Sequence, residues 1–234
     1  MLYVNGCSFA WGQGAHPSND QDLVKPHRFS YLLAQSLGIE EYNGAVPGSS
    51  NQRIARRSFI DILTLKPKLA IIVWSQPSRI EFTDYRANPY KFGEDARQFR
   101  VSQVETAHES KEIKAALRMY FEHLSGTYSD IANTMYYAAN VKMVCDSLNI
   151  PCIQMWITDK CMEMVRESEQ SPSEAYIHTF NQYKNYLTSD PNVWMYDGPT
   201  FADISNNKIV SEVDQHPNAE GHYDAYLYLK EKLS

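Results

Sequence analysis

Several features that would assign this sequence to other classes of protein are missing. Its four cysteines, among 234 residues, form no Cys-x-x-Cys pair and no dense framework, which excludes a zinc knuckle and a disulfide scaffold. No run of lysine or arginine occurs, and the formal net charge is -6, so neither nucleic acid nor an anionic membrane is an expected partner. The longest apolar run, Leu69–Trp74, is far shorter than the roughly 20 residues of a membrane-spanning helix.

The start of the chain also lacks a secretion signal. Met1 leads directly into a strand-like segment, with no basic stretch followed by a long apolar one. Unpaired cysteines suit a reducing compartment, so we expect a cytoplasmic protein. The sequence says nothing about oligomeric state.

The sequence contains enough apolar residues to form a hydrophobic core. Hydrophobic residues make up 43% of the chain and charged residues 21%, which is typical of a folded protein. A chain of 234 residues suits one sizeable α/β domain and is short for two. With no internal repeat or low-complexity segment in it, we expect a single domain over residues 1–234.

Strand-like and helix-like segments alternate along the chain. The predicted strands are 2–5, 39–42, 69–74, 150–156 and 192–196. The predicted helices are 29–37, 51–63, 112–124, 128–148, 173–187 and 218–233. This alternation predicts a flavodoxin-like three-layer α/β/α sandwich with a mostly parallel five-stranded sheet and right-handed crossovers.

One region departs from this alternation. From residue 75 to about 110 the composition is polar and irregular, with Pro77, Pro89 and Gly93, which predicts a long loop. Together with the helix that follows, residues 75–125 are expected to form an insertion over the carboxyl ends of the strands. We expect this insertion to shape a substrate cleft.

Ser8, in the segment NGCSFAWG, lies just past the first predicted strand and is either a turn residue or a nucleophile. A catalytic serine needs a base, a group that orients the base, and donors for the oxyanion. In VDQHPNAEGH, Asp214 and His216 are two residues apart and fixed by Pro217, so the carboxylate can hold the imidazole. The alternative interpretation is a loop followed by a helix that Asn218 caps.

The segment NGAVPGSSN offers the oxyanion donors. It follows the second predicted strand, and glycine N–H groups in such a loop can approach a ligand closely. The alternative is an ordinary turn and a helix N-cap. Because ligands bind at the carboxyl ends of parallel strands, its place beside Ser8 favours a shared site.

In this order, the three segments resemble the opening, glycine and closing blocks of the SGNH hydrolases, the superfamily of GDSL-type esterases and lipases. The resemblance implies a serine ester hydrolase with a catalytic triad of Ser8, Asp214 and His216. It also implies that the N–H groups of Ser8 and Gly48 form the oxyanion hole. The implied substrate is a small-molecule or carbohydrate ester, for instance an O-acetylated sugar, and neither cofactor nor metal is implied.

Three departures from the family pattern stand out. The family usually has Gly-x-Asn-Asp after the third strand, with the Asn in the oxyanion hole, but here the chain reads VWSQPSRIE. The candidates to replace that donor are Asn51, Ser75 and Gln76. The closing block is Asp-x-His, shorter than the usual Asp-x-x-His, which leaves Glu212 as an alternative carboxylate. Cys7 replaces the usual Asp, and we interpret it as structural rather than as a rival nucleophile.

Other residues have two interpretations each. His222 either joins Asp214 and His216 in a metal site or is an ordinary helical histidine. Arg79 either pairs with Glu81 or binds an acidic group of the substrate, and Arg53 is similarly ambiguous. Trp11 and Trp74 either stack on a sugar ring or simply pack.

Two other functions remain open from the sequence. The missing asparagine is compatible with a binding or structural protein that keeps the scaffold without turnover. An O-acyltransferase would use the same triad.

Overall fold

The structure, a computed structural model, describes residues 1–18, 20–83, 96–99, 111–171 and 173–234. Its centre is a five-stranded sheet in the order β2-β1-β3-β6-β7 in which every neighbouring pair is parallel. The strands are β1 (Leu2–Gly6), β2 (Glu41–Asn43), β3 (Leu69–Trp74), β6 (Cys152–Trp156) and β7 (Val193–Trp194). All five predicted strands are therefore confirmed, with β7 shorter than expected.

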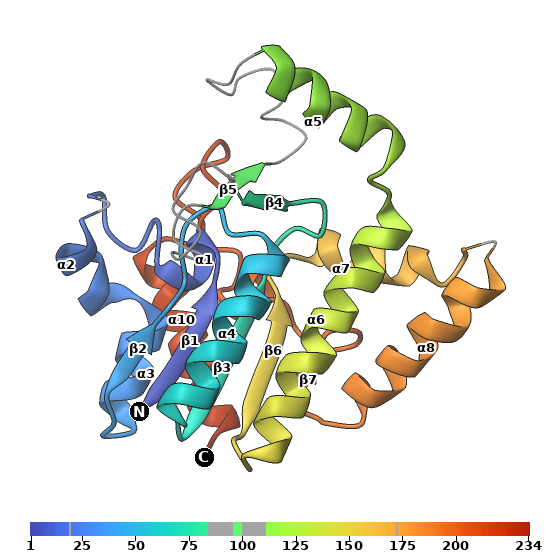
Figure 1. Cartoon of the computed structure of the whole chain (residues 1–234). Coiled ribbons are helices and arrows are strands. Elements are labelled where there is room, and N and C mark those ends of the chain that lie inside the picture. The colour runs from blue at the N-terminus through green and yellow to red at the C-terminus, as the bar shows by residue number, and fades with distance from the viewer. Residues whose placement is uncertain (19, 84–95, 100–110, 172) are drawn as a thin grey trace.

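Helices cover both faces of this sheet (Figure 1). On one face α6 packs between α4 and α8, and on the other α3 packs against α10. Their bounds are α3 (Phe29–Ser36), α4 (Asn51–Leu65), α6 (Thr127–Ser147), α8 (Glu174–Thr188) and α10 (Ala219–Lys232). The architecture is the predicted three-layer α/β/α sandwich with a parallel sheet.

The apolar pattern of the strands explains why the sheet lies inside. All six residues of β3 are buried, as expected for a strand with a helical layer on each face. Tyr3 on β1 is buried too, and its hydroxyl donates to an Asp61 carboxylate oxygen at 3.2 Å. Burial raises the pKa of Tyr3 well above its ordinary value.

Short helices escaped the sequence analysis. They are α1 (Ser8–Trp11), α2 (Gln21–Val24), the 3₁₀-helix η1 (Lys25–His27), α7 (Asp159–Ser168) and α9 (Phe201–Ile204). The buried face of α7 consists of Cys161, Met162, Val165 and Ser168. Charged residues lie between them in the sequence. One-turn helices such as α1 carry too few residues to show a period.

The polar region after β3 was predicted as a loop, which is wrong in part. The structure places an antiparallel pair there, β4 (Ile80–Thr83) and β5 (Ala96–Phe99), followed by α5 (Lys111–His123). Figure 1 shows these elements above the edge at which β1, β3 and β6 end. The rest of the predicted loop, 84–95 and 100–110, lies outside the described residues. The division into one domain with an insertion stays a prediction.

The four cysteines are buried and unpaired. In the part of the chain that the structure describes, no helix combines the length and the apolar character needed to cross a membrane.

His222 on α10 is a fully buried imidazole behind the sheet. Its ring packs against those of Phe29 and Phe201, with centroids 6.1 and 5.8 Å away. Neither ring nitrogen makes a hydrogen bond of regular geometry, although the backbone of Gln13 lies near. Burial lowers the pKa of His222 to about 3, so this residue is neutral in the folded chain at ordinary pH.

Stability is therefore expected to fall in acid. Once unfolded, His222 binds a proton below about pH 6.5, whereas the folded residue stays neutral until about pH 3. Unfolding takes up a proton in this window, so the free energy of unfolding decreases as the pH falls. Between about pH 7 and pH 5, wild type should lose roughly 2 kcal/mol more than His222→Leu in urea unfolding. Parallel losses in both proteins would contradict this account of His222.

Candidate active site

Ser8 begins α1 immediately after β1, at the edge of the sheet where the parallel strands end. Cys7 is the N-cap of this helix and is fully buried. The backbone carbonyl of Ser8 accepts hydrogen bonds from the N–H groups of Gly12 and Gln13, which folds the following turn tightly. The turn therefore fixes the backbone from which the Ser8 hydroxyl projects.

His216 and Asp214 lie against Ser8 although 208 positions separate Ser8 from His216. Ser8 Oγ is 2.8 Å from His216 Nε2, and His216 Nδ1 is 2.5 Å from Asp214 Oδ1. If Nδ1 carries the proton and donates it to the carboxylate, Nε2 is free to accept from the hydroxyl. The hydrogen bond from His216 holds the pKa of the Asp214 carboxyl below its ordinary value.

The backbone around His216 holds the imidazole in this position. The His216 carbonyl accepts from the N–H of Val210 at 2.9 Å, and the Asp214 carbonyl accepts from Ser211 at 3.0 Å. Gly14 lets the loop after α1 come close, because a Cβ there would lie 3.2 Å from His216 Cβ. The triad geometry thus rests on contacts between the first and the last loops at this edge.

The loop after β2 lies on the other side of Ser8. The N–H of Val46 donates to the carbonyl of Gly6 at 3.3 Å, which ties this loop to the end of β1. Gly48 has a φ of +83°, a conformation that favours glycine. Among the described residues, the Gly48 backbone N–H donates no hydrogen bond.

Asn43, which the sequence analysis did not single out, braces this arrangement. Its Nδ2 donates to the carbonyl of Ala10 in α1 at 2.8 Å, and its Oδ1 accepts from the N–H of Ala45 at 3.0 Å. Ser30 Oγ, itself 2.5 Å from a Glu41 carboxylate oxygen, lies 3.3 Å from Asn43 Nδ2. One partly buried amide thus joins the Ser8 helix to the loop that carries Gly48. An asparagine at the end of a strand was the only signal in the sequence.

Comparisons with known proteins place this geometry in context. No family model and no curated protein matches the sequence. Among solved structures, a putative lipolytic protein of the G-D-S-L family from Desulfitobacterium hafniense DCB-2 superposes with a TM-score of 0.51 and 14% identity over 98% of this chain and 97% of its own. The esterase EstA from Pseudoalteromonas sp. superposes with a TM-score of 0.50 and 10% identity, over 99% of this chain and 97% of its own.

The fold is that of the SGNH hydrolases.

A further match shows the range of proteins with this fold. The acetyl xylan esterase Est2A from Butyrivibrio proteoclasticus superposes with a TM-score of 0.52 and 12% identity over 99% of this chain and 63% of its own. The SGNH fold is therefore one that esterases use, and Ser8 lies after the first strand of this fold.

The third block of the SGNH pattern is where this chain differs. Asn51, a predicted oxyanion donor, has both amide hydrogens committed, to the Ser75 carbonyl at 3.0 Å and to Thr134 Oγ1 at 3.1 Å. Its Oδ1 accepts from the Ser75 N–H at 2.7 Å, so Asn51 is a brace and its prediction as a donor is corrected. Gln76 is exposed. Ser75 Oγ is buried without a hydrogen-bond partner among the described residues, which leaves Ser75 as the remaining candidate for the missing oxyanion donor.

Several other predicted roles change. Trp74 is fully buried in β3 and its Nε1 donates to Gln154 Oε1 at 2.9 Å, so it packs in the core and stacks on no ligand. Trp11, at the end of α1, is partly buried against the core. Glu81 pairs with Arg56 at 2.7 Å rather than with Arg79. Glu212 is exposed, and the carboxylate on His216 is Asp214.

The metal alternative fails on geometry in the described residues. His222 is enclosed by phenylalanine rings and does not join Asp214 and His216. No three side chains of His, Cys, Asp or Glu in the described ranges are arranged to hold a metal ion.

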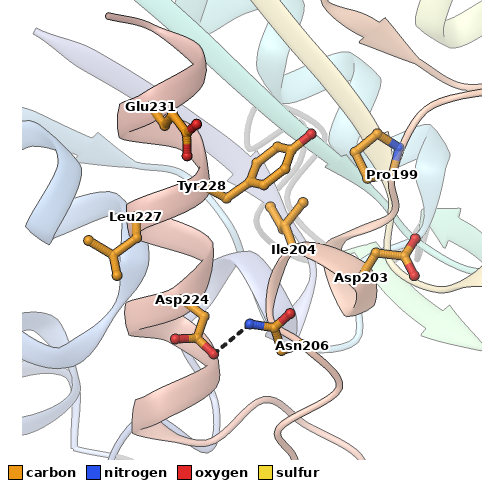
Figure 2. Close-up of a pocket in the computed structure, with 8 residues that line it drawn as sticks. All are labelled: Pro199, Asp203, Ile204, Asn206, Asp224, Leu227, Tyr228 and Glu231. Atoms are coloured by element: carbon orange, nitrogen blue, oxygen red, sulfur yellow. Dashed lines mark hydrogen bonds between the residues drawn. The ribbon is translucent and has the colours of Figure 1, made fainter.

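Two hollows can be placed relative to the contact between Ser8 and His216. One, of about 350 Å³ and drawn in Figure 2, lies between α9 and α10, where Asn206 donates to Asp224 at 2.9 Å. It contains none of the predicted site residues. The other, of about 210 Å³, is lined by Phe9, which follows Ser8, and by Gln215 and Pro217, which flank His216. This second hollow is lined by chain neighbours of Ser8 and His216, and by neither residue itself.

Proposed function

We propose that the chain is a serine ester hydrolase. The observation that carries the proposal is the continuous contact from the Asp214 carboxylate through His216 to the Ser8 hydroxyl, with distances of 2.5 and 2.8 Å. A base within hydrogen-bond reach is what an alcohol needs to become a nucleophile. An SGNH fold in which other proteins are esterases supports it.

Each step can be assigned to a group. Ser8 Oγ attacks the acyl carbonyl while His216 Nε2 takes its proton, and Asp214 stabilises the imidazolium. The tetrahedral oxyanion is bound by the N–H groups of Ser8 and Gly48, with Ser75 Oγ as a third donor. His216 then protonates the leaving alcohol, and water, activated by the same imidazole, releases the acyl group from Ser8.

Small acyl groups on carbohydrates are the proposed substrate class. The solved structure of an acetyl xylan esterase with this fold supports it, as does the hollow that Phe9, Gln215 and Pro217 line. Phe9 forms one wall of that hollow, with its ring centroid 5.3 Å from that of His216. An acyl group held there would remain close to the reacting atoms.

The pH dependence of hydrolysis tests this assignment. Only a neutral imidazole can accept the Ser8 proton, so kcat/KM for 4-nitrophenyl acetate, followed from about pH 5 to about pH 8, is expected to fall as the solution becomes more acidic. The measurement is steady-state hydrolysis at constant ionic strength, corrected for the uncatalysed rate. A flat profile across this range would contradict a histidine base.

A further inference from the structure

Two arginines converge on Ser49, the residue after Gly48. Arg79 Nη1 lies 3.4 Å from the Ser49 carbonyl oxygen, and Arg53 Nη1 lies 3.2 Å from Ser49 Oγ. Arg79 belongs to the loop after β3 and Arg53 to the first turn of α4. Because Ser49 follows Gly48, both guanidinium groups lie next to the loop that carries the proposed oxyanion donor.

Carboxylates do not neutralise this pair within the described residues. Neither Arg53 nor Arg79 has a carboxylate oxygen within 4 Å among those residues, and Glu81 makes its two short contacts with Arg56, at 2.7 and 2.8 Å. Burial lowers the pKa of the Arg53 guanidinium, which shows that its charge is poorly solvated there. Arg79 Nε is buried and has no protein acceptor.

The side chain of Arg79 lines a small polar cavity of about 60 Å³. That volume is about twice the share of one water molecule in the liquid, which suits a carboxylate group. Most other lining side chains are neutral and polar, namely Asn51, Gln52, Tyr120, Asn133, Thr134 and Tyr137, and two are apolar, Pro77 and Ile80. The one carboxylate in the lining, Asp130, accepts a hydrogen bond from Ser125 Oγ at 3.0 Å, and burial raises its pKa.

We propose that Arg79, with Arg53 beside it, binds a carboxylate on the substrate, so that the preferred esters carry an anionic group near the scissile bond. A guanidinium fork matches a carboxylate in geometry and charge. The inference deepens the proposed function and rests on it: the triad cleaves the ester while Arg79 selects esters of acidic molecules, such as acetylated acidic sugars.

Two esters that differ in one charge test the selection. 4-Acetoxybenzoate carries a carboxylate, and methyl 4-acetoxybenzoate does not. Wild type is expected to show a kcat/KM about 10- to 100-fold higher on the anionic ester than on the neutral one. Arg79→Gln should lose this advantage mainly through KM and change the neutral ester little. Arg79→Lys should recover only part of it, because it keeps the charge without the fork.

Arg57→Gln is the matched control. Arg57 is on the same helix as Arg53 and already pairs with Asp61 at 3.1 Å. Its removal takes away the same charge and should leave the preference intact. Equal rates of wild type on the two esters, or equal loss on both in Arg79→Gln, would overturn the proposal.

A binding measurement separates this inference from the esterase proposal. 4-Acetamidobenzoate is an amide analogue that the triad is not expected to cleave readily, and 4-acetamidobenzamide is its neutral counterpart. Calorimetry should show tighter binding of the carboxylate to wild type and to Ser8→Ala, and loss of that difference in Arg79→Gln. Such binding without any ester hydrolysis would support the carboxylate site and reject the esterase proposal. Ester hydrolysis without charge-dependent binding would support the esterase proposal and reject the carboxylate site.

Discussion

Replacement of Ser8 by alanine is expected to lower kcat for 4-nitrophenyl acetate by about 10⁴-fold or more. Without Oγ the chain has no nucleophile next to His216, and only the oxyanion donors remain to assist attack by water. The measurement is initial-rate hydrolysis with enzyme in large amount, so that a residual rate can be told from the uncatalysed one.

Cys7→Ala is the matched control for this change. Cys7 is adjacent to Ser8 and fully buried, and its Sγ lies 4.0 Å from Ser8 Oγ. This variant should keep most of the activity, because the thiol takes no part in the proposed chemistry. Comparable rates in Ser8→Ala and wild type, or a collapse confined to Cys7→Ala, would reject Ser8 as the nucleophile.

Replacement of His216 by alanine should cost about as much as loss of Ser8, again about 10⁴-fold in kcat. The hydroxyl and the imidazole act as one unit, so the double variant should be no slower than either single variant. Losses that multiply in the double variant would show that the two residues work independently. The comparison requires the same ester and the same pH for all three proteins.

Asp214→Asn is expected to have a smaller effect than either change. The Asp214 side chain is 43% exposed, so water can replace part of its stabilisation of the imidazolium. Asparagine also favours the wrong tautomer of His216, which is why a clear loss should remain.

The same assays separate the other two functions that the sequence left open. A binding protein would show Ser8 and His216 in contact but no turnover of any ester. An O-acyltransferase would release the acyl group faster when an alcohol is added and would form the new ester. Fold similarity alone decides neither case.

Much of the fold could be predicted because burial leaves a clear periodic pattern. Strand β3 is a continuous apolar run, and α4 repeats apolar residues on one face, so both were placed nearly to the residue. The antiparallel pair β4 and β5 was missed, since each strand has four residues and neither has the continuous apolar run of β3. Helix α1 was missed because one turn is too short to show a period.

The candidate site was predictable only where a local segment carries the chemistry. Ser8 and Gly48 follow strands β1 and β2, and Asp214 and His216 precede helix α10, all in recognisable segments. Pairings between distant side chains were not predictable: Asn51 with Ser75, or Arg56 with Glu81, depend on which side chains the tertiary fold brings into contact. No spacing along the chain records such contacts, which is also why Asn43 was overlooked.

The central claim is that His216 and Asp214 activate Ser8, and a mechanism-based label tests it most directly. The solved structures with this fold include an esterase inhibited by monoethylphosphonate. If His216 and Asp214 activate Ser8, a reactive ethyl phosphonate ester should modify this chain once, with peptide mass spectrometry placing the adduct on Ser8 and with labelling largely lost in His216→Ala. An adduct on another residue, no adduct at all, or an adduct on Ser8 that forms equally fast without His216 would contradict the claim.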